Sequence, residues 1–113
     1  MYQQEAPARV PEKGFYYHYK HDPEGAFNNY AYEVVGVGRH TEEDASERDQ
    51  HMVIYRPLYE ALVYKNGKMF DARPLSMFLE EVEKDGKRIP RFTKIANGEL
   101  IAQLEVLREK MYR

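Results

Sequence analysis

Residues 51–82 place an extended run, a tight-turn signal and a helical pattern in close succession, and few folds accommodate that order. Met52–Tyr55 is rich in β-branched and aromatic side chains, as is typical of a strand. Arg56-Pro57 should end this strand, because proline cannot donate to a strand ladder and holds its predecessor extended. Asn66-Gly67 predicts a hairpin between residues 62–64 and 68–70, since a type I′ turn needs positive φ at both central positions.

A short amphipathic pattern follows the second Arg-Pro step, Arg73-Pro74. Proline suits the first position of a helix, where its missing N–H costs nothing. Apolar residues then recur at helical spacing, at Leu75, Phe78, Leu79 and Val82. The pattern predicts a helix near residues 74–81, packed over a sheet.

Further short strands are predicted at residues 15–19, 30–38 and 89–92, each bounded by turn residues. In the second of these, alternation puts Gly36 and Gly38 on the face of Tyr32 and Val34, and glycines inside a strand often mark a bulge or bend. The chain has 10 Tyr, 5 Phe and no Trp, which favours an aromatic-filled β core over a helical bundle.

These elements predict a mostly β fold with α elements, of the α+β class. A small, partly closed antiparallel SH3-like barrel is the first choice, and a PUA-like or other mixed small barrel is the alternative. The predicted organisation is a flexible tail at 1–13, a barrel domain at 14–95 and a C-terminal helical segment at 96–113.

The C-terminal segment reads as a helix near residues 98–112, with Asn97 as its N-cap. Its apolar stripe comprises Leu100, Leu104, Leu107 and Met111. The spacings of four, three and four resemble a short coiled-coil seam. The stripe therefore packs on the barrel of its own chain, or it pairs with a partner, including a second copy in a homo-oligomer.

Charge and composition exclude several classes of protein. The formal net charge of -2 provides no global basic field, so nonspecific high-affinity DNA binding is disfavoured, although a local basic face is compatible with it. Without cysteine, the chain has no disulfide, thiolate zinc site or cysteine nucleophile. It shows no signal-peptide pattern and no membrane-spanning apolar run. We expect a soluble, cytoplasmic protein that does not enter a membrane.

Cationic and aromatic residues near the predicted strand ends form the candidate ligand site. Three arginines near a barrel mouth could bind a phosphate or carboxylate, and neighbouring aromatic rings could stack on a base or sugar. The candidates are Arg56, Arg73, Arg91, His18, His40, Tyr16 and Tyr59. The alternative is that each arginine pairs with an acid, among Glu33, Asp71 and Glu80, and braces the fold. Among the aromatic residues, we expect Tyr17, Tyr19, Tyr32 and Phe78 in the core. We expect the two candidates Tyr16 and Tyr59 at the surface.

Signals for catalysis and metal binding are weak. The four histidines are His18, His21, His40 and His51, and their spacing matches no established metal motif. Glu33 lies within a predicted strand, where a Glu-His or Glu-Arg pair serves as a catalytic dyad in some enzymes and as a structural ion pair in more. We therefore predict no metal, no cofactor and no catalytic residue.

Four segments in a fixed order resemble a widespread family of small bacterial proteins known only as a domain of unknown function. The segments are GFYYHYKH, YEVVGVGRHTE, MVIYRPLY and ARPLSMFLEEVEKDGKRIPRF, and the resemblance covers roughly residues 14–95. The chain departs from the family pattern at Gly38, in longer loops at 21–29 and 41–50, and in the added helix at 97–113. The resemblance implies a domain identity and no established activity.

The predicted function is a non-enzymatic small-barrel binding module for a phosphate-bearing ligand or nucleic acid. The alternative is a structural or interaction subunit that acts through the C-terminal helix or a sheet edge. An enzyme ranks third, because no nucleophile elbow, phosphate loop or catalytic triad spacing is present in the sequence.

Overall fold

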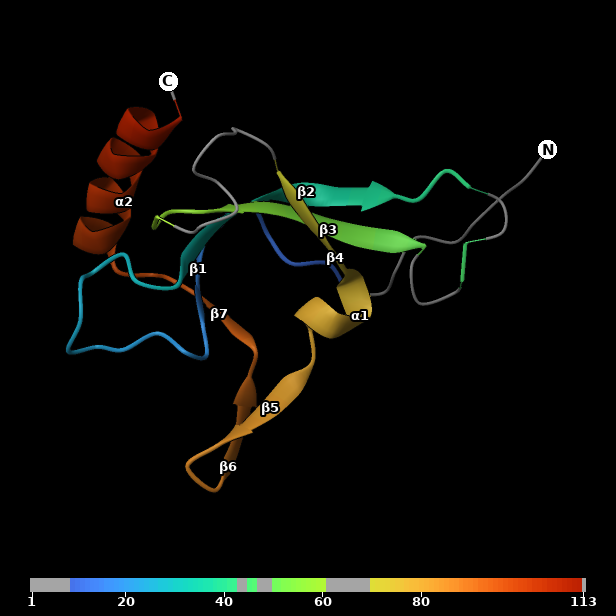
Figure 1. Cartoon of the computed structure of the whole chain (residues 1–113), viewed down its shortest axis with the longest axis horizontal. Coiled ribbons are helices and arrows are strands. Elements are labelled where there is room, and N and C mark those ends of the chain that lie inside the picture. Colours follow the sequence, from blue (N-terminus) through green and yellow to red (C-terminus); the bar gives the residue numbers. More distant parts are fainter. Residues whose placement is uncertain (1–8, 43–44, 47–49, 61–69, 113) are drawn as a thin grey trace.

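The computed structural model describes residues 9–42, 45–46, 50–60 and 70–112. A five-stranded antiparallel sheet dominates it, with the strand order β4-β3-β2-β1-β7. Its strands are β1 (Gly14–His18), β2 (Ala31–Arg39), β3 (His51–Pro57), β4 (Asp71–Pro74) and β7 (Phe92–Lys94). The strands β5 (Glu81–Lys84) and β6 (Lys87–Pro90) form a separate hairpin that extends away from this sheet (Figure 1). The predicted hairpin at Asn66-Gly67 lies outside the described residues.

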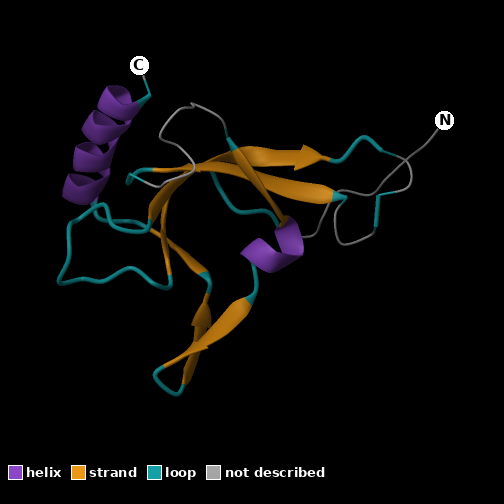
Figure 2. Ribbon diagram, viewed as in Figure 1, coloured by secondary structure: helices purple, strands orange, loops and turns teal. Residues whose placement is uncertain are grey.

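Two helices complete the fold, α1 (Leu75–Phe78) and α2 (Gly98–Met111). Figure 2 shows α2 at one side of the sheet, well separated from α1. This arrangement confirms the α+β class with a short and a C-terminal helix. Among the described strands, however, the sheet stays open rather than closing on itself, so the SH3-like barrel is not confirmed. None of the described helices is long and apolar enough to cross a membrane.

The helix α1 is shorter than the predicted span of 74–81, because the chain turns into strand β5 at Glu81. Val82, which the helical pattern included, instead pairs with Ile89 across the hairpin. The turn explains this outcome: Asp85 and Gly86 both have positive φ, 53° and 78°, as a type I′ hairpin turn requires. The β-branched pair and the turn together favour the hairpin over a second helical turn.

A bulge in β2 changes which face its glycines occupy. The register with β3 shifts between Val34 and Gly36, so that Val34 lies opposite Tyr55 and Val37 opposite Val53. An extra residue inverts the alternation beyond it. Gly36 and Gly38 therefore share the face opposite to Val34, and the simple alternation predicted from the sequence was wrong for this half of the strand.

Both faces of the five-stranded sheet are buried. One face carries Tyr16, Val34, Val53, Tyr55 and Phe92, covered by Leu75 and Phe78 of α1. The other carries Phe15, Ala31, Leu58 and Ile95, covered by Leu104 of α2. We call these the α1 face and the α2 face.

The two-sided core corrects one prediction about the aromatics. Tyr16 was expected at the surface, but it is only 6% exposed. Its ring meets Phe78 edge-on, with centroids 5.5 Å apart, and its hydroxyl donates to the Glu12 carbonyl oxygen at 2.8 Å. The prediction assumed that β1 is buried on one face alone, but side chains on both faces of this strand are covered. Phe78 is buried as expected. Tyr17, Tyr19 and Tyr32, which were expected in the core, are half-buried, and so is Tyr59, which was expected at the surface.

Candidate functional site

An aromatic and cationic cluster surrounds His18 on the α1 face, at the end of β1. The ring of His18 lies near those of Tyr30, Tyr32 and Phe92, with centroid distances of 5.7, 6.3 and 5.1 Å. Tyr59 extends the cluster, 5.4 Å from Tyr30 and 5.5 Å from Tyr32. We define the His18 site as the group His18, Lys20, Tyr30, Tyr32, Tyr55, Tyr59, Arg73, Lys84 and Arg91.

The protonation state of His18 follows from its surroundings. Burial, and then the charges of Arg73, Lys20, Arg91 and Lys84, lower the pKa of His18 to about 4, so the ring is neutral at pH 7. Its Nδ1 accepts the backbone N–H of Lys20 at 3.2 Å. A neutral imidazole has one protonated nitrogen, so Nε2 carries the proton and is a hydrogen-bond donor.

Two tyrosine hydroxyls of the His18 site are paired with each other. The Tyr32 and Tyr59 oxygens are 2.6 Å apart, so one hydroxyl donates to the other. Burial raises the pKa of both phenols above the ordinary value of 10. Both tyrosines are therefore protonated at neutral pH, and one of the two hydroxyl protons is not used within the pair.

Arg73 is held over the core of the α1 face. Its Nε donates to the Tyr55 hydroxyl at 3.2 Å, and its guanidinium carbon lies 5.5 Å from the Phe92 ring centroid. These two contacts orient the planar guanidinium. Asp71, on the same strand, has a pKa raised by burial, an effect that the positive charge of Arg73 partly offsets.

Arg91 is the least satisfied cation of the site. Its backbone is fixed, because its N–H donates to the Glu80 carbonyl at 2.9 Å and its carbonyl accepts the Tyr19 N–H at 2.8 Å. Its side chain makes a long ion pair with Glu80, 3.7 Å from Nη2 to Oε2. Its Nε is buried and has no hydrogen-bond partner within the described part of the chain. A buried unpaired donor normally costs about 1–3 kcal/mol.

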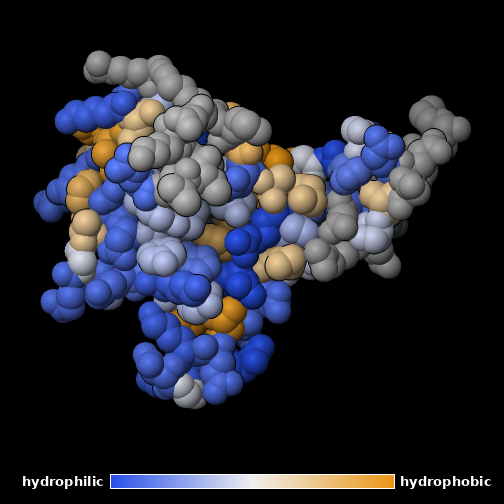
Figure 3. Space-filling view, in the orientation of Figure 1, coloured by the Kyte–Doolittle hydropathy of each residue, from blue (hydrophilic) through white to orange (hydrophobic). Residues whose placement is uncertain are grey.

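Two lysines add positive charge at the rim. Lys84 of the β5–β6 hairpin donates from Nζ to the Tyr19 carbonyl oxygen at 2.7 Å, which ties the hairpin to the end of β1. Lys20 is exposed, with Nζ 6.0 Å from the Tyr19 ring centroid. The hairpin itself appears as a strongly hydrophilic projection, with apolar residues visible where it joins the body (Figure 3).

The structure brings together four of the predicted site residues, His18, Tyr59, Arg73 and Arg91. Arg56 lies elsewhere, because it follows Tyr55 in β3 and points to the α2 face, whereas Arg73 pairs with Val53 and shares the face of Tyr55. The predicted joint patch of Arg56 and Arg73 is therefore wrong.

His40 and Tyr16 are also apart from the cluster. His40 is exposed beyond the far end of β2, which at about 3.3 Å per residue is roughly 30 Å from the start of that strand near His18. Tyr16 is in the core, as described above.

The α2 face holds a separate ionic cluster, in which Arg56 pairs with Glu33 as the structural alternative described. Arg56 Nε lies 3.0 Å from Glu33 Oε1, and Arg108 Nη1 of α2 lies 2.8 Å from Glu33 Oε2. The guanidinium of Arg56 also stacks on Tyr112, 4.1 Å from its ring centroid. These contacts join α2 to the middle of the sheet.

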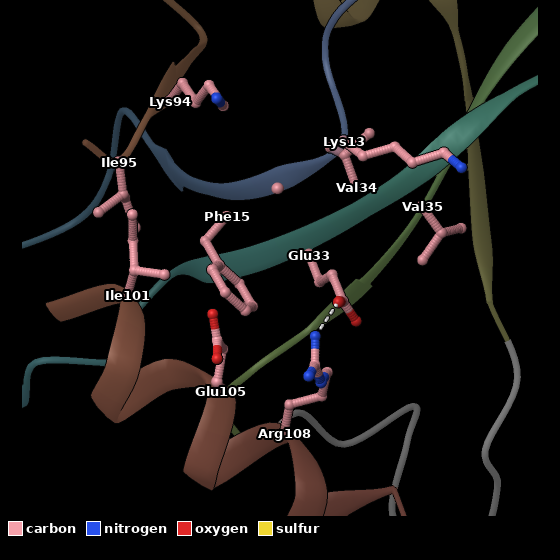
Figure 4. Close-up of a pocket in the computed structure, with 11 residues that line it drawn as sticks. Lys13, Phe15, Glu33, Val34, Val35, Lys94, Ile95, Ile101, Glu105 and Arg108 are labelled. Carbon is pink, nitrogen blue, oxygen red and sulfur yellow. Dashed lines mark hydrogen bonds and ion pairs between the residues drawn. The ribbon is translucent and has the colours of Figure 1, made fainter. Parts of the chain in front are cut away.

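Beside this cluster the sheet and α2 line a cavity of about 460 Å³. Figure 4 shows the Glu33–Arg108 ion pair at the cavity, with Phe15, Ile95 and Ile101 along its apolar side. Because both carboxylate oxygens of Glu33 already contact arginines, the pair reads as structural bracing rather than as a proton-transfer dyad.

The predicted interaction stripe of α2 contacts its own chain. Leu104 is fully buried, Leu100 and Leu107 pack partly buried against the same core, and Met111 is half-buried. Asn97 caps the helix as predicted, its side-chain oxygen accepting the Leu100 N–H at 3.0 Å. The intramolecular alternative for the stripe is thus the one observed in this structure.

Sequence reasoning did not include several members of the site, namely Lys20, Tyr30, Tyr32, Tyr55 and Lys84. Tyr55 and Tyr32 could have been found from strand alternation. It puts Tyr55 on the same face as Val53 in β3, and Tyr32 on the same face as Val34 in β2. Tyr30 was predicted as the first residue of the strand at 30–38, but it precedes β2 and has a positive φ of 54°, unusual for a residue with a side chain. Lys84 contacts the site only because β5 and β6 form a hairpin, and the sequence pattern at residues 75–82 predicted a helix instead.

The donors of the site suit an anion better than a metal. His18 Nε2, Arg73 and Arg91 are all donors of N–H groups, and metal ions need acceptors. Among the described residues, no group of three or more His, Asp or Glu side chains could hold a metal ion.

A family model described as "Protein of unknown function (DUF1653)" matches residues 14–94. The chain belongs to this family. A crystal structure of a DUF1653 protein from Bordetella bronchiseptica is similar, with a TM-score of 0.51 and 28% sequence identity over 74% of this chain and 86% of that chain. No curated protein matches the chain. The helix α2 lies outside the DUF1653 match, in agreement with its prediction as an addition to the family pattern.

Proposed function

We propose that the chain is a non-enzymatic binding module whose His18 site takes a phosphate-bearing ligand. The single observation that supports this most is Arg91, one of four cations that act on His18, whose buried Nε–H has no hydrogen-bond partner within the described part of the chain. The Arg91 side chain as a whole is 20% exposed, and an anion beside its guanidinium would offset the like charges gathered around His18.

The donor types agree with this proposal. Arginine binds phosphate through its planar fork, and a neutral His18 adds an N–H donor from Nε2 without adding to the charge repulsion. The Tyr32–Tyr59 pair retains one hydroxyl proton that could serve a further phosphate oxygen. Glu80 competes only weakly for Arg91, since their side chains are 3.7 Å apart, whereas Asp71 shares the face of Arg73 and interacts with its charge.

The test is titration calorimetry with inorganic pyrophosphate, at about 50 mM and about 200 mM salt, because phosphate binding by cations weakens with salt. We expect Arg91→Met to lower the affinity by roughly 10- to 100-fold, the worth of charge-assisted hydrogen bonds. Arg73→Lys should also weaken binding, because lysine keeps the charge but loses the fork.

Arg88→Met is the matched control, since Arg88 is an exposed cation on β6 that pairs with Glu81 at 3.7 Å. It removes the same charge outside the His18 site and should leave the affinity unchanged. The proposal fails if pyrophosphate does not bind at low salt, or if Arg88→Met weakens binding as much as Arg91→Met does.

A further inference from the structure

The backbone of Tyr30 is held in an unfavourable conformation next to the His18 site. Its φ of 54° lies in the left-handed region, which suits glycine or asparagine better than a bulky residue. The segment is fixed there, because the Tyr30 carbonyl accepts the His18 N–H at 3.0 Å and the Ala31 N–H donates to the Asn28 carbonyl at 3.1 Å. Strain of this kind often persists where the side chain is needed for function.

With its backbone in this conformation, Tyr30 places its ring between those of His18 and Tyr59, and the three rings form a row. The Tyr30 ring stacks on His18 at an interplanar angle of 27° and meets Tyr59 at 41°, with centroids 5.7 and 5.4 Å away. All three rings are half-buried. Rings in this state keep part of their surface accessible, and an aromatic surface of this kind is what nucleobases stack on.

The row of rings and the cations meet at His18. The Tyr30 ring stacks on His18 and meets Tyr59, while Arg73, whose guanidinium lies over Phe92, and Arg91 are among the charges that act on His18. A ligand that reached both groups would combine a planar aromatic ring with a phosphate. A nucleotide has this composition, whereas inorganic phosphate or a sugar phosphate lacks the ring.

We propose that the ligand of the His18 site is a nucleotide unit, with its phosphate at Arg73 and Arg91 and its base against Tyr30 and Tyr59. This inference rests on the proposed phosphate binding and adds the class of ligand. The same unit occurs as a free nucleotide and within a single RNA strand, so the test includes both.

The experiment compares ribose 5-phosphate, adenosine, adenosine 5′-monophosphate and a tetraadenylate RNA by titration calorimetry of the full chain. We expect the monophosphate to bind roughly 5- to 100-fold more tightly than ribose 5-phosphate, which is the range that base–aromatic stacking provides. Tighter binding of tetraadenylate than of the monophosphate supports a strand as the source, and equal or weaker binding supports the free nucleotide.

Tyr30→Asn separates the ring from the backbone, because asparagine tolerates the left-handed conformation. This variant should fold normally, bind ribose 5-phosphate as the wild type does, and lose the preference for the monophosphate. Tyr30→Phe keeps the ring and should keep the preference.

The failures of the two proposals are distinguishable in the wild-type protein alone. Equal affinities for ribose 5-phosphate and the monophosphate overturn the nucleotide inference and leave phosphate binding intact. Adenosine that binds as tightly as the monophosphate overturns the phosphate site, and no binding of any of the four compounds overturns both.

Discussion

At the scale of single residues, His18 shows how position determines chemistry. A histidine at a strand end is usually solvated, but here the ring is packed among Tyr30, Tyr32 and Phe92 and faces several cations. Protonation would add a charge to an environment that is already positive and poorly hydrated. The residue is thereby restricted to its neutral form and to a single donor, which a pH-dependent measurement can reveal.

We predict that His18 makes the protein less stable in mild acid. The folded pKa is about 4 and the ordinary value is 6.5, so between these values the unfolded chain binds a proton that the folded chain does not. Stability is therefore complete above pH 6.5 and is lost as the pH falls toward 4. With about 1.4 kcal/mol per pKa unit, discounted for partial solvent exposure, we expect a loss of about 2 kcal/mol.

Urea unfolding at about pH 7 and about pH 4.5 measures this loss. His18→Asn should reduce the difference between the two conditions, because asparagine can accept the Lys20 N–H without titrating. His40→Asn is the matched control: His40 accepts the Glu42 N–H at 3.1 Å in the same local geometry, but its ring is exposed. Equal pH dependence in the wild type and His18→Asn would contradict the prediction.

Glu33 is the second residue whose environment decides its role. Its carboxylate side chain is 12% exposed and contacts both Arg56 and Arg108. We predict that Glu33→Gln lowers the free energy of unfolding by about 2–4 kcal/mol, because Arg56 loses the carboxylate that it contacts and Arg108 keeps only the exposed Glu109, at 3.1 Å. Chemical denaturation measures the change. Glu105→Gln, at an exposed position lining the same cavity, should change stability by less than about 0.5 kcal/mol, and a similar loss in both variants would refute the bracing role.

At the scale of elements, local signals competed and tertiary contacts chose between them. Residues 75–82 have a helical spacing, yet only Leu75–Phe78 is helical, because the Asp85-Gly86 turn pairs Val82 with Ile89. In β2, the bulge after Val34 reverses the alternation. The helix α2 had no such competitor: its cap, its length and its apolar stripe all agreed, and it forms as predicted.

For α2 we predict that stability depends on Leu104 and hardly on Val106. Leu104 has no exposed surface and joins the core of the α2 face, whereas Val106 is 57% exposed. Leu104→Ala should cost about 2–5 kcal/mol, since it removes buried apolar contacts and leaves a cavity. Val106→Ala is the control and should cost less than about 0.5 kcal/mol. Thermal and urea unfolding report both, and comparable losses would mean that α2 packs through another face.

At the scale of the whole molecule, a single open sheet carries two different groups of charged residues on its two faces. The α2 face is covered by a helix outside the family match and braced by Glu33, Arg56 and Arg108. The α1 face carries the His18 site beside a short helix and a projecting hairpin. The bracing contacts and the proposed ligand site therefore lie on opposite faces of the sheet.

The packing of the α2 stripe leads to a prediction about the oligomeric state. Since Leu100, Leu104 and Leu107 pack against their own sheet, they are not free to form a seam with a second copy. We predict a monomer in size-exclusion chromatography with light scattering, unchanged by Val106→Glu. A concentration-dependent dimer that Val106→Glu dissociates would instead support the alternative function, an interaction subunit acting through α2.

The sequence alone determined the features that depend on near neighbours in the chain. The strand at Met52–Tyr55 and the Asn97 cap with its helix each follow from residues a few positions apart. The family resemblance was also available from ordered short motifs, and the match to residues 14–94 confirms it. Four members of the candidate site were identifiable as cations and aromatics near strand ends.

Only the tertiary structure decided which of these residues meet. Arg56 and Arg73 look equivalent in sequence, since each precedes a proline, but the register of β3 and β4 sends them to opposite faces of the sheet. Tyr16 becomes core because α1 covers its face, and Tyr30 reaches His18 through a backbone conformation that no local pattern indicates. The physical reason is that a one-residue change in register moves a side chain across the sheet, and strand register depends on pairing between distant segments.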